Sequence, residues 1–282
     1  MFHSTWEENQ MKLFKENVRN SRELKVIMVF SLLIFASCCI SVIYGVNFTR
    51  NRLKVTNIVL SNLDILYSFN DWGIICDTNF YLIIIPIFSA LIIYIINYNN
   101  NFIRIIRFKT RDNLWNHKIF FIIIASLLLS IVLTGCGYLI GGIILKGFSY
   151  PWTLDNTMPY KVFEEHGMLS TIHSALATYK VLITFCTTTF LGLSFLGILI
   201  CTLKLILNDV YVYIILMGLI VMEEYKIIGF KFITRVIVFP SYWLNPGSLI
   251  INYMFFLFGF FILYFVGRFI NSKRDQCISK KY

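Results

Sequence analysis

Six apolar stretches, separated by polar segments, are the feature that most constrains the fold of this 282-residue chain. We expect them to form transmembrane helices at about residues 25–46, 80–96, 119–145, 180–206, 210–222 and 249–270. A helix needs about 20 mostly apolar residues to cross the hydrocarbon core of a bilayer, and only the fifth stretch falls well short. Charged residues make up 14% of the chain, against about 25% in soluble domains. The sequence therefore predicts an all-α, polytopic membrane protein.

The basic residues predict an orientation for these spans. With the N-terminus placed in the cytoplasm, 16 of the 25 Lys and Arg residues fall on the inner side and nine on the outer side. This asymmetry follows the positive-inside rule and predicts that both termini, including the tail at residues 271–282, are cytoplasmic in a cell membrane. The net charge of +10 is then explained by topology, and no nucleic-acid partner is expected.

Residues 1–24 have the pattern of an amphipathic helix that precedes the first span. At about 100° per residue, Trp6, Met11, Phe14 and Val18 share one half of the helical wheel, whereas charged residues occupy the other half. Such a helix is suited to lie in the interface of the membrane. A short solvated helix that binds a partner is the alternative.

The loop at residues 97–118 is basic and also periodic. A short helix at its centre would carry apolar side chains on one face and guanidinium groups on the opposite face. The residues concerned are Phe102, Ile103, Ile105, Ile106, Arg104, Arg107 and Arg111. This pattern favours a helix that binds a partner protein, and ordinary positive-inside charge is the alternative.

Two further features lie within the apolar stretches. Pro86 predicts a kink in the second span, because proline cannot donate a helical hydrogen bond. Gly137 and Gly141 form a G-x-x-x-G pattern in the third span, and small residues at this spacing let two membrane helices approach closely. The pattern also occurs by chance in apolar helices. The polar segments 47–79 and 146–179 are longer than simple turns, which leaves room for extra outer helices.

Glu223 and Glu224 interrupt the fifth stretch. A second apolar piece follows them, so residues 223–248 are expected to form an outer hairpin before the last span. An adjacent pair of glutamates also occurs in intramembrane proteases of the CAAX-processing type, which place an arginine four residues after the second glutamate. Ile228 stands at that position here, and no histidine lies in a predicted span. Charges at the outer water interface are the simpler explanation.

Taken together, the helix at Trp6–Val18, the six spans, the loop helix at Phe102–Arg111 and the interrupted stretch 223–248 resemble exporter-type permeases of the second ABC class. The small permeases of low-GC Gram-positive bacteria are nearest in character. The resemblance implies an interfacial helix, a coupling helix after the second span and a re-entrant helical hairpin before the last span. It further implies a second permease copy or homologue and separate ATPase subunits that bind ATP and magnesium.

The expected function is therefore outward transport of a hydrophobic or amphipathic substrate such as a peptide, an antibiotic or a lipid. The sequence contains no G-x-x-x-x-G-K-[ST] phosphate loop and no metal-binding motif, so the chain is not expected to be an enzyme or to hold a cofactor itself. A membrane anchor, a sensor or an immunity protein without transport activity is the alternative, as is a secondary transporter.

Overall fold

A computed structural model describes residues 29–30, 32–33, 35–37, 39, 61–66, 80–99, 110–144, 148, 152–155, 157–225, 227, 234–238 and 241–273. The predicted interfacial helix at residues 1–24 lies outside the described residues, and so do residues 102–109 of the predicted coupling helix and residues 274–282 of the tail. Within the first predicted span, the eight described residues between 29 and 39 are all helical.

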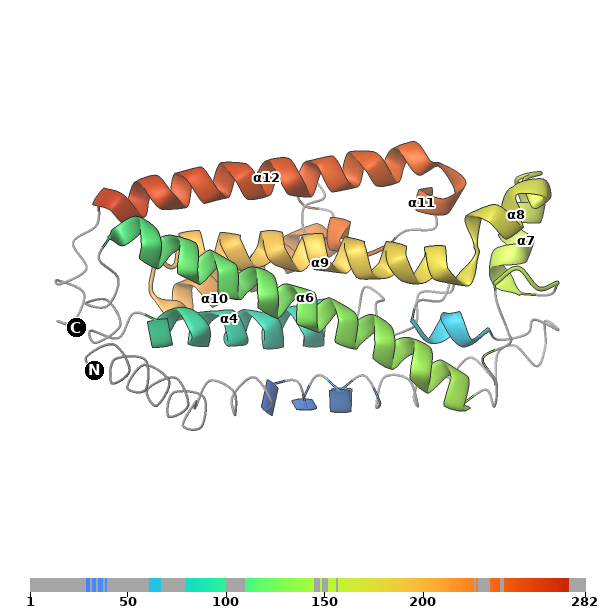
Figure 1. Ribbon diagram of the computed structural model, residues 1–282, viewed down its shortest axis with the longest axis horizontal. Helices are drawn as coiled ribbons and strands as arrows, with labels where there is room; N and C mark the ends of the chain where they lie inside the picture. Colours follow the sequence, from blue (N-terminus) through green and yellow to red (C-terminus); the bar gives the residue numbers. More distant parts are fainter. Residues whose placement is uncertain are drawn as a thin grey trace, which may run out of the picture.

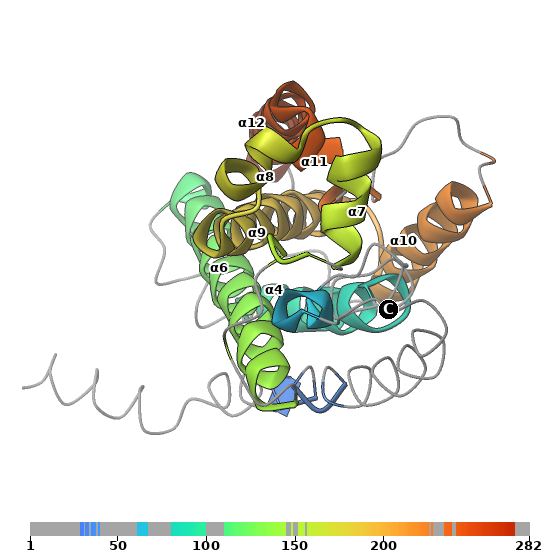
Figure 2. The ribbon, with the colours of Figure 1, turned by 90° about the vertical axis from the view of Figure 1, so that its right-hand side faces the viewer.

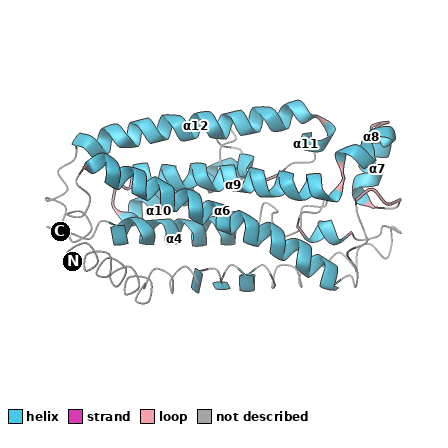
Figure 3. Cartoon of the chain, viewed as in Figure 1, coloured by secondary structure: helices cyan, strands magenta, loops and turns pink. Residues whose placement is uncertain are grey.

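Every regular element in this part of the chain is a helix, as the sequence predicts (Figure 3). The long helices are α4 (Ile85–Asn99), α6 (Arg111–Ile144), α9 (Thr178–Leu203), α10 (Asp209–Glu224) and α12 (Pro246–Lys273). The short elements are η1 (Asn62–Ile65), the π-helical turn η2 (Phe80–Ile84), α7 (Met158–Glu165), α8 (Leu169–Ala175), η3 (Thr234–Val236) and α11 (Ser241–Leu244).

Helix α9 forms the core of a bundle whose long helices run along one axis (Figure 1). The end-on view shows α9 between α4, α6 and α12, with α10 leaning away from the bundle (Figure 2). In the most apolar window of each helix, 67% of the residues are buried in α9, 39% in α6 and 11% in α12. α9 is therefore the helix around which the others pack, and α12 lies at the edge.

Three of these helices are long and apolar enough to cross a membrane, and they coincide with the predicted third, fourth and last spans. Large apolar side chains point away from the bundle, among them Phe258, Phe261 and Phe265 of α12, each of which is more than half exposed. Water would penalise such an apolar surface, whereas the hydrocarbon core of a bilayer would not. The described part of the chain thus has the surface and helix lengths of a membrane protein.

The predicted second and fifth spans are also helical but differ from regular spanning helices. η2 continues directly into α4, and the π-helical turn lies just before Pro86, where the sequence predicts a kink. α10 has 16 residues and is therefore about 24 Å long, which is less than the ~30 Å thickness of the hydrocarbon core. The fifth stretch is short in the structure, as it is in the sequence.

Helix α6 begins at Arg111, eight residues before the predicted start of the third span, so the loop after α4 is shorter than predicted. The Thr110 hydroxyl accepts a hydrogen bond from the Asn113 amide at 3.2 Å, which caps the first turn. Leu114 and Trp115 are buried in this extension. The helix therefore continues beyond its apolar part because capping and packing stabilise it there, and polar composition alone is a poor guide to its start.

The polar segment at residues 146–179 contains two short helices, α7 and α8, at one end of the bundle (Figures 1 and 2). Gly167 joins them with φ of +66°, a left-handed conformation that glycine adopts without steric cost. The Met168 amide donates to the Phe163 carbonyl at 2.8 Å and closes this turn. We call this end of the bundle the loop end. The opposite end, where α6 begins and α12 ends, is called the clamp end.

Candidate functional site

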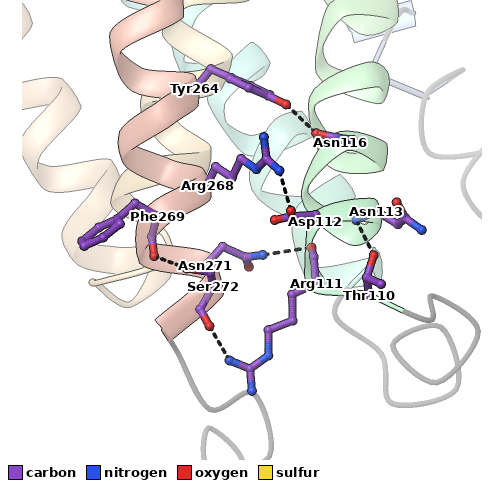
Figure 4. A network of polar contacts seen from close by, with 10 residues as sticks. All are labelled: Thr110, Arg111, Asp112, Asn113, Asn116, Tyr264, Arg268, Phe269, Asn271 and Ser272. Carbon is purple, nitrogen blue, oxygen red and sulfur yellow. Dashed lines mark hydrogen bonds and ion pairs between the residues drawn. The ribbon is translucent and has the colours of Figure 1, made fainter.

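Polar contacts join α6 and α12 at the clamp end (Figure 4). We call this group of contacts the α6–α12 clamp. It comprises hydrogen bonds from Arg111 Nη1 to the Ser272 carbonyl at 2.7 Å, from Asn271 Nδ2 to the Arg111 carbonyl at 3.1 Å, from Arg268 Nη2 to Asp112 Oδ2 at 2.6 Å and from Tyr264 OH to Asn116 Oδ1 at 2.7 Å. The clamp ties the first turns of α6 to the last turns of α12.

The clamp fixes geometry more than it adds stability. The side chains of Asp112 and Arg268 are 41% and 45% exposed, and an ion pair this exposed usually contributes about 0–1 kcal/mol. Beneath it, the indole of Trp115 packs against Gly267 of α12, where a Cβ atom would lie 2.3 Å from the ring. Close packing thus brings the two helices together, and the directional polar contacts set their register.

A second polar contact at the clamp end joins three other helices. Asn97, near the end of α4, donates to Asp209 Oδ2 at 2.7 Å, and Lys204, just after α9, forms an ion pair with the same carboxylate. Asp209 is the first residue of α10. The ends of α4 and α9 are therefore tied to the start of α10, at the same end of the bundle as the clamp (Figure 1).

The segment between α10 and α12 returns to the middle of α9. Val236 of η3 packs on Gly192, where a Cβ atom would lie only 2.4 Å from Val236 Cγ1. Gly192 is about 21 Å along α9 from Thr178, with about 17 Å remaining to Leu203. Val236, Ile237 and Val238 are fully buried. Glycine at this point allows η3 to lie directly against the backbone of the central helix.

Polar groups gather where η3 meets α9 and α12. Asn252 of α12 donates to the Arg235 carbonyl at 3.1 Å, and the Arg235 guanidinium lies over the ring of Phe255 at 4.7 Å from its centroid. Between α9 and α12, the hydroxyls of Thr187 and Tyr253 are 2.5 Å apart. This group of residues lies well inside the length of α9 and α12.

At the loop end, a buried carboxylate connects two segments that are far apart in the sequence. Asp64 of η1 is 2% exposed, and it accepts hydrogen bonds from the Ser61 amide and from Trp152 Nε1, both at 2.8 Å. Burial raises the pKa of Asp64 to about 7, although the hydrogen bonds from Ser61 and Trp152 act in the opposite direction. Trp152 in turn stacks edge-on against Trp243 of α11, with centroids 5.2 Å apart.

We expect the stability of the protein to fall as the pH rises from 5 to 8. The pKa of Asp64 is raised from 3.8 to about 7 on folding, so the folded protein binds more protons than the unfolded chain in this interval. About two pKa units lie between pH 5 and the folded pKa of about 7, so at 1.36 kcal/mol per unit the loss over this interval is about 3 kcal/mol. Thermal unfolding followed by tryptophan fluorescence measures this slope.

Asp64→Asn removes the titrating group at constant size and should remove most of the slope between pH 5 and 8. Asp155→Asn, at an exposed aspartate of the same end, is the matched control and should retain the slope of the unmodified protein. An unchanged slope in Asp64→Asn would show that another group governs the pH dependence.

The structure separates the residues that the sequence singled out. Arg111 is not part of a loop helix but begins α6 and joins the α6–α12 clamp. Gly137 and Gly141 are buried within the chain, which leaves them unavailable to a second copy. Glu223 is buried, and Glu224 ends α10. The other predicted coupling residues, Phe102, Ile103, Arg104, Ile106 and Arg107, lie outside the described residues.

Arg235 and Asp64 are functional candidates that the sequence analysis did not identify. Arg235 is a charge within the apolar run Ile227–Val238, and that position was the available signal. The sequence does not show that Arg235 lies beside the middle of α9. That position depends on the contact between Gly192 and Val236. No local signal distinguishes Asp64 from its neighbours, because its burial depends on Trp152, 88 residues away.

Comparisons of the chain with protein-family models, with curated proteins and with solved structures found no match.

Proposed function

We propose that this chain is the membrane-spanning subunit of an ABC transporter that moves a hydrophobic or amphipathic substrate outward. ATP and magnesium are bound by separate ATPase subunits, and the chain works as a pair with a second copy or a homologue. It crosses the cell membrane six times, with both termini and the clamp end in the cytoplasm and the loop end outside. This proposal combines the sequence resemblance with the helix arrangement.

The observation that carries the proposal is the path of the chain between α10 and α12. α10 is too short for a full crossing, and η3 then packs at the middle of α9 before α12 begins. A returning segment between the fifth and the last span is what the resemblance implies. A simple membrane anchor has no need of a segment that packs inside its own bundle.

The α6–α12 clamp supports a route for mechanical coupling. Residues 102–109, which we propose to contact the ATPase, immediately precede the capped start of α6. Arg111 connects that start to Ser272 at the end of α12. A movement of the ATPase that displaces this loop would therefore move α6 together with α12. Such joint movement is what alternating access to a central or lateral substrate path requires.

The face of α12 turned away from the bundle supports pairing with another subunit or contact with lipid. Only 11% of its most apolar window is buried by the chain itself. Because Gly137 and Gly141 are already buried, the pairing surface must be sought on exposed faces such as that of α12. The substrate would then pass along a path between the two copies.

We expect ATPase activity to co-purify with the tagged chain from membranes of its native host, and Arg104→Glu/Arg107→Glu to abolish this association. Placing carboxylates where guanidinium groups meet a partner costs several kcal/mol, and 1.4 kcal/mol corresponds to a tenfold change in affinity. The double variant should therefore lose association at least about tenfold, measured as ATP hydrolysed per mole of purified chain.

Lys280→Glu/Lys281→Glu makes the same charge change in the predicted cytoplasmic tail and should leave association unchanged. Equal amounts of the chain in the membrane fraction establish that both variants insert. Full ATPase association and normal transport in Arg104→Glu/Arg107→Glu would contradict the assignment of the coupling loop. Absence of any co-purifying ATPase from the unmodified protein would contradict the transporter itself.

A further inference from the structure

Three connecting segments of the chain meet around Asp64 at the loop end. η1 carries Asp64 and lies between the first and second predicted spans, whereas Trp152 lies between the third and fourth. Trp243 belongs to α11, directly before the last span. The indole of Trp152 contacts both of the others, because its N–H donates to Asp64 Oδ1 and its ring stacks against Trp243. The hydrogen bond between Asp64 and Trp152 therefore connects η1 to the corner that precedes α12.

η1 is a single helical turn, and its burial depends on the Asp64 carboxyl. Ser61, Leu63 and Leu66 are buried together with Asp64. The amides of Asp64 and Leu66 donate to the carbonyls of Ser61 and Leu63, both at 3.0 Å, and the Leu63 amide donates to the Ser61 hydroxyl at 3.3 Å. The Ser61 amide donates to Asp64 Oδ2. Because the carboxyl accepts from this turn and from Trp152, a change in its charge acts on both at once.

The surroundings of Asp64 do little to stabilise its charge. α6 packs on η1, but Arg111, Asp112, His117 and Lys118 all lie in its first eight residues, at the clamp end. Burial is the largest cause of the raised pKa of Asp64, and the hydrogen bonds from Ser61 and Trp152 are the opposing causes. The other titratable or charged groups on the segments that pack against η1 and Trp152 are Cys136 and Tyr138 of α6, Asp155, Tyr179, Lys180, Cys186 and Cys201 of α9, and Tyr242 of α11.

We infer that Asp64 is a pH-sensitive switch of the loop end: its neutral carboxyl keeps η1 packed against Trp152, and loss of the proton opens this contact. Once the contact is open, water solvates the carboxylate and the pKa of Asp64 returns towards 3.8. Opening therefore becomes about tenfold more favourable for each pH unit until the folded pKa of about 7, and then levels off. The inference goes beyond the proposed function and does not depend on it.

Hydrogen–deuterium exchange of the purified full chain in detergent measures this opening. The exchange rates of the Ser61, Leu63, Asp64 and Leu66 amides, each divided by the rate of an unprotected amide at the same pH, give the ratio of open to closed η1. We expect this ratio to rise about 100-fold between pH 5 and 7, and little between pH 7 and 8. At each pH it should exceed the ratio for amides in the middle of α9 by at least about tenfold, because those amides exchange only when the bundle unfolds.

Three variants assign the rise to Asp64. Asp64→Asn keeps the size of the side chain but cannot titrate, so its ratio should not change with pH. Trp152→Phe keeps an aromatic ring but removes one of the two hydrogen bonds that favour the ionised carboxyl, so the rise should continue beyond pH 7. Asp155→Asn changes an exposed aspartate of the same end and should keep the rise of the unmodified protein.

A ratio that stays constant between pH 5 and 7 in the unmodified protein would overturn the inference, and so would an equal rise in Asp64→Asn. Equal ratios in η1 and in the middle of α9 would show that η1 opens only when the whole bundle unfolds, which also contradicts a switch. If Asp64→Asn does not fold, Trp152→Phe decides: a rise that ends at pH 7, as in the unmodified protein, would contradict control by the Asp64 carboxyl.

Discussion

Gly192→Ala is expected to destabilise the protein by about 1–3 kcal/mol, because the added methyl overlaps a buried side chain. The new Cβ atom would lie 2.4 Å from Val236 Cγ1 and 2.9 Å from both Val236 Cβ and Cγ2, closer than packed carbon atoms can approach. Either η3 moves away from α9 or the central helix shifts. Both changes open the core around the buried residues Val236, Ile237 and Val238. The change is measured as a lower thermal unfolding midpoint in detergent.

Gly218→Ala is the matched control, because a Cβ atom at this position of α10 meets nothing within 4 Å. Alanine is favoured over glycine inside a helix by about 1 kcal/mol, so this variant should be as stable as the unmodified protein or more stable. Adding Val236→Ala to Gly192→Ala removes the nearest methyl and should recover part of the loss. If Gly192→Ala behaves like Gly218→Ala, η3 does not pack against the centre of α9.

The helices of this chain could be predicted from the sequence because each carries its own signal. The apolar runs of α6, α9 and α12 are long enough to specify a membrane span by length alone. Pro86 marks the irregular turn in the second helix, and the charges at Glu223 and Glu224 mark the end of α10. These signals are local, so no tertiary contact is needed to read them.

The boundaries and the sites could not be predicted because they depend on contacts between distant residues. The start of α6 at Arg111 is stabilised by Thr110 and by contacts with α12, and polar composition alone placed it in a loop. The depth of Arg235 follows from Gly192, 43 positions earlier in the chain. A glycine in an apolar helix gives no sign of which segment will pack against it.

The orientation of the bundle underlies both the coupling loop and the clamp. It predicts that the start of α6 faces the cytoplasm, whereas α7, at the loop end, faces the outside (Figure 1). Lys161 lies in α7, and Lys109 lies two residues before α6. Because a charged reagent does not cross the hydrocarbon core, labelling at these two positions should be nearly all-or-none.

The most direct test of the account is therefore the labelling of single cysteines in intact cells with a membrane-impermeant maleimide. Lys161→Cys and Lys109→Cys are each introduced into a chain whose seven native cysteines are replaced by serine or alanine. We expect Lys161→Cys to react in intact cells and Lys109→Cys to react only after the membrane is permeabilised. Reaction of Lys109→Cys in intact cells, with Lys161→Cys protected, would reverse the orientation and contradict the proposed transporter.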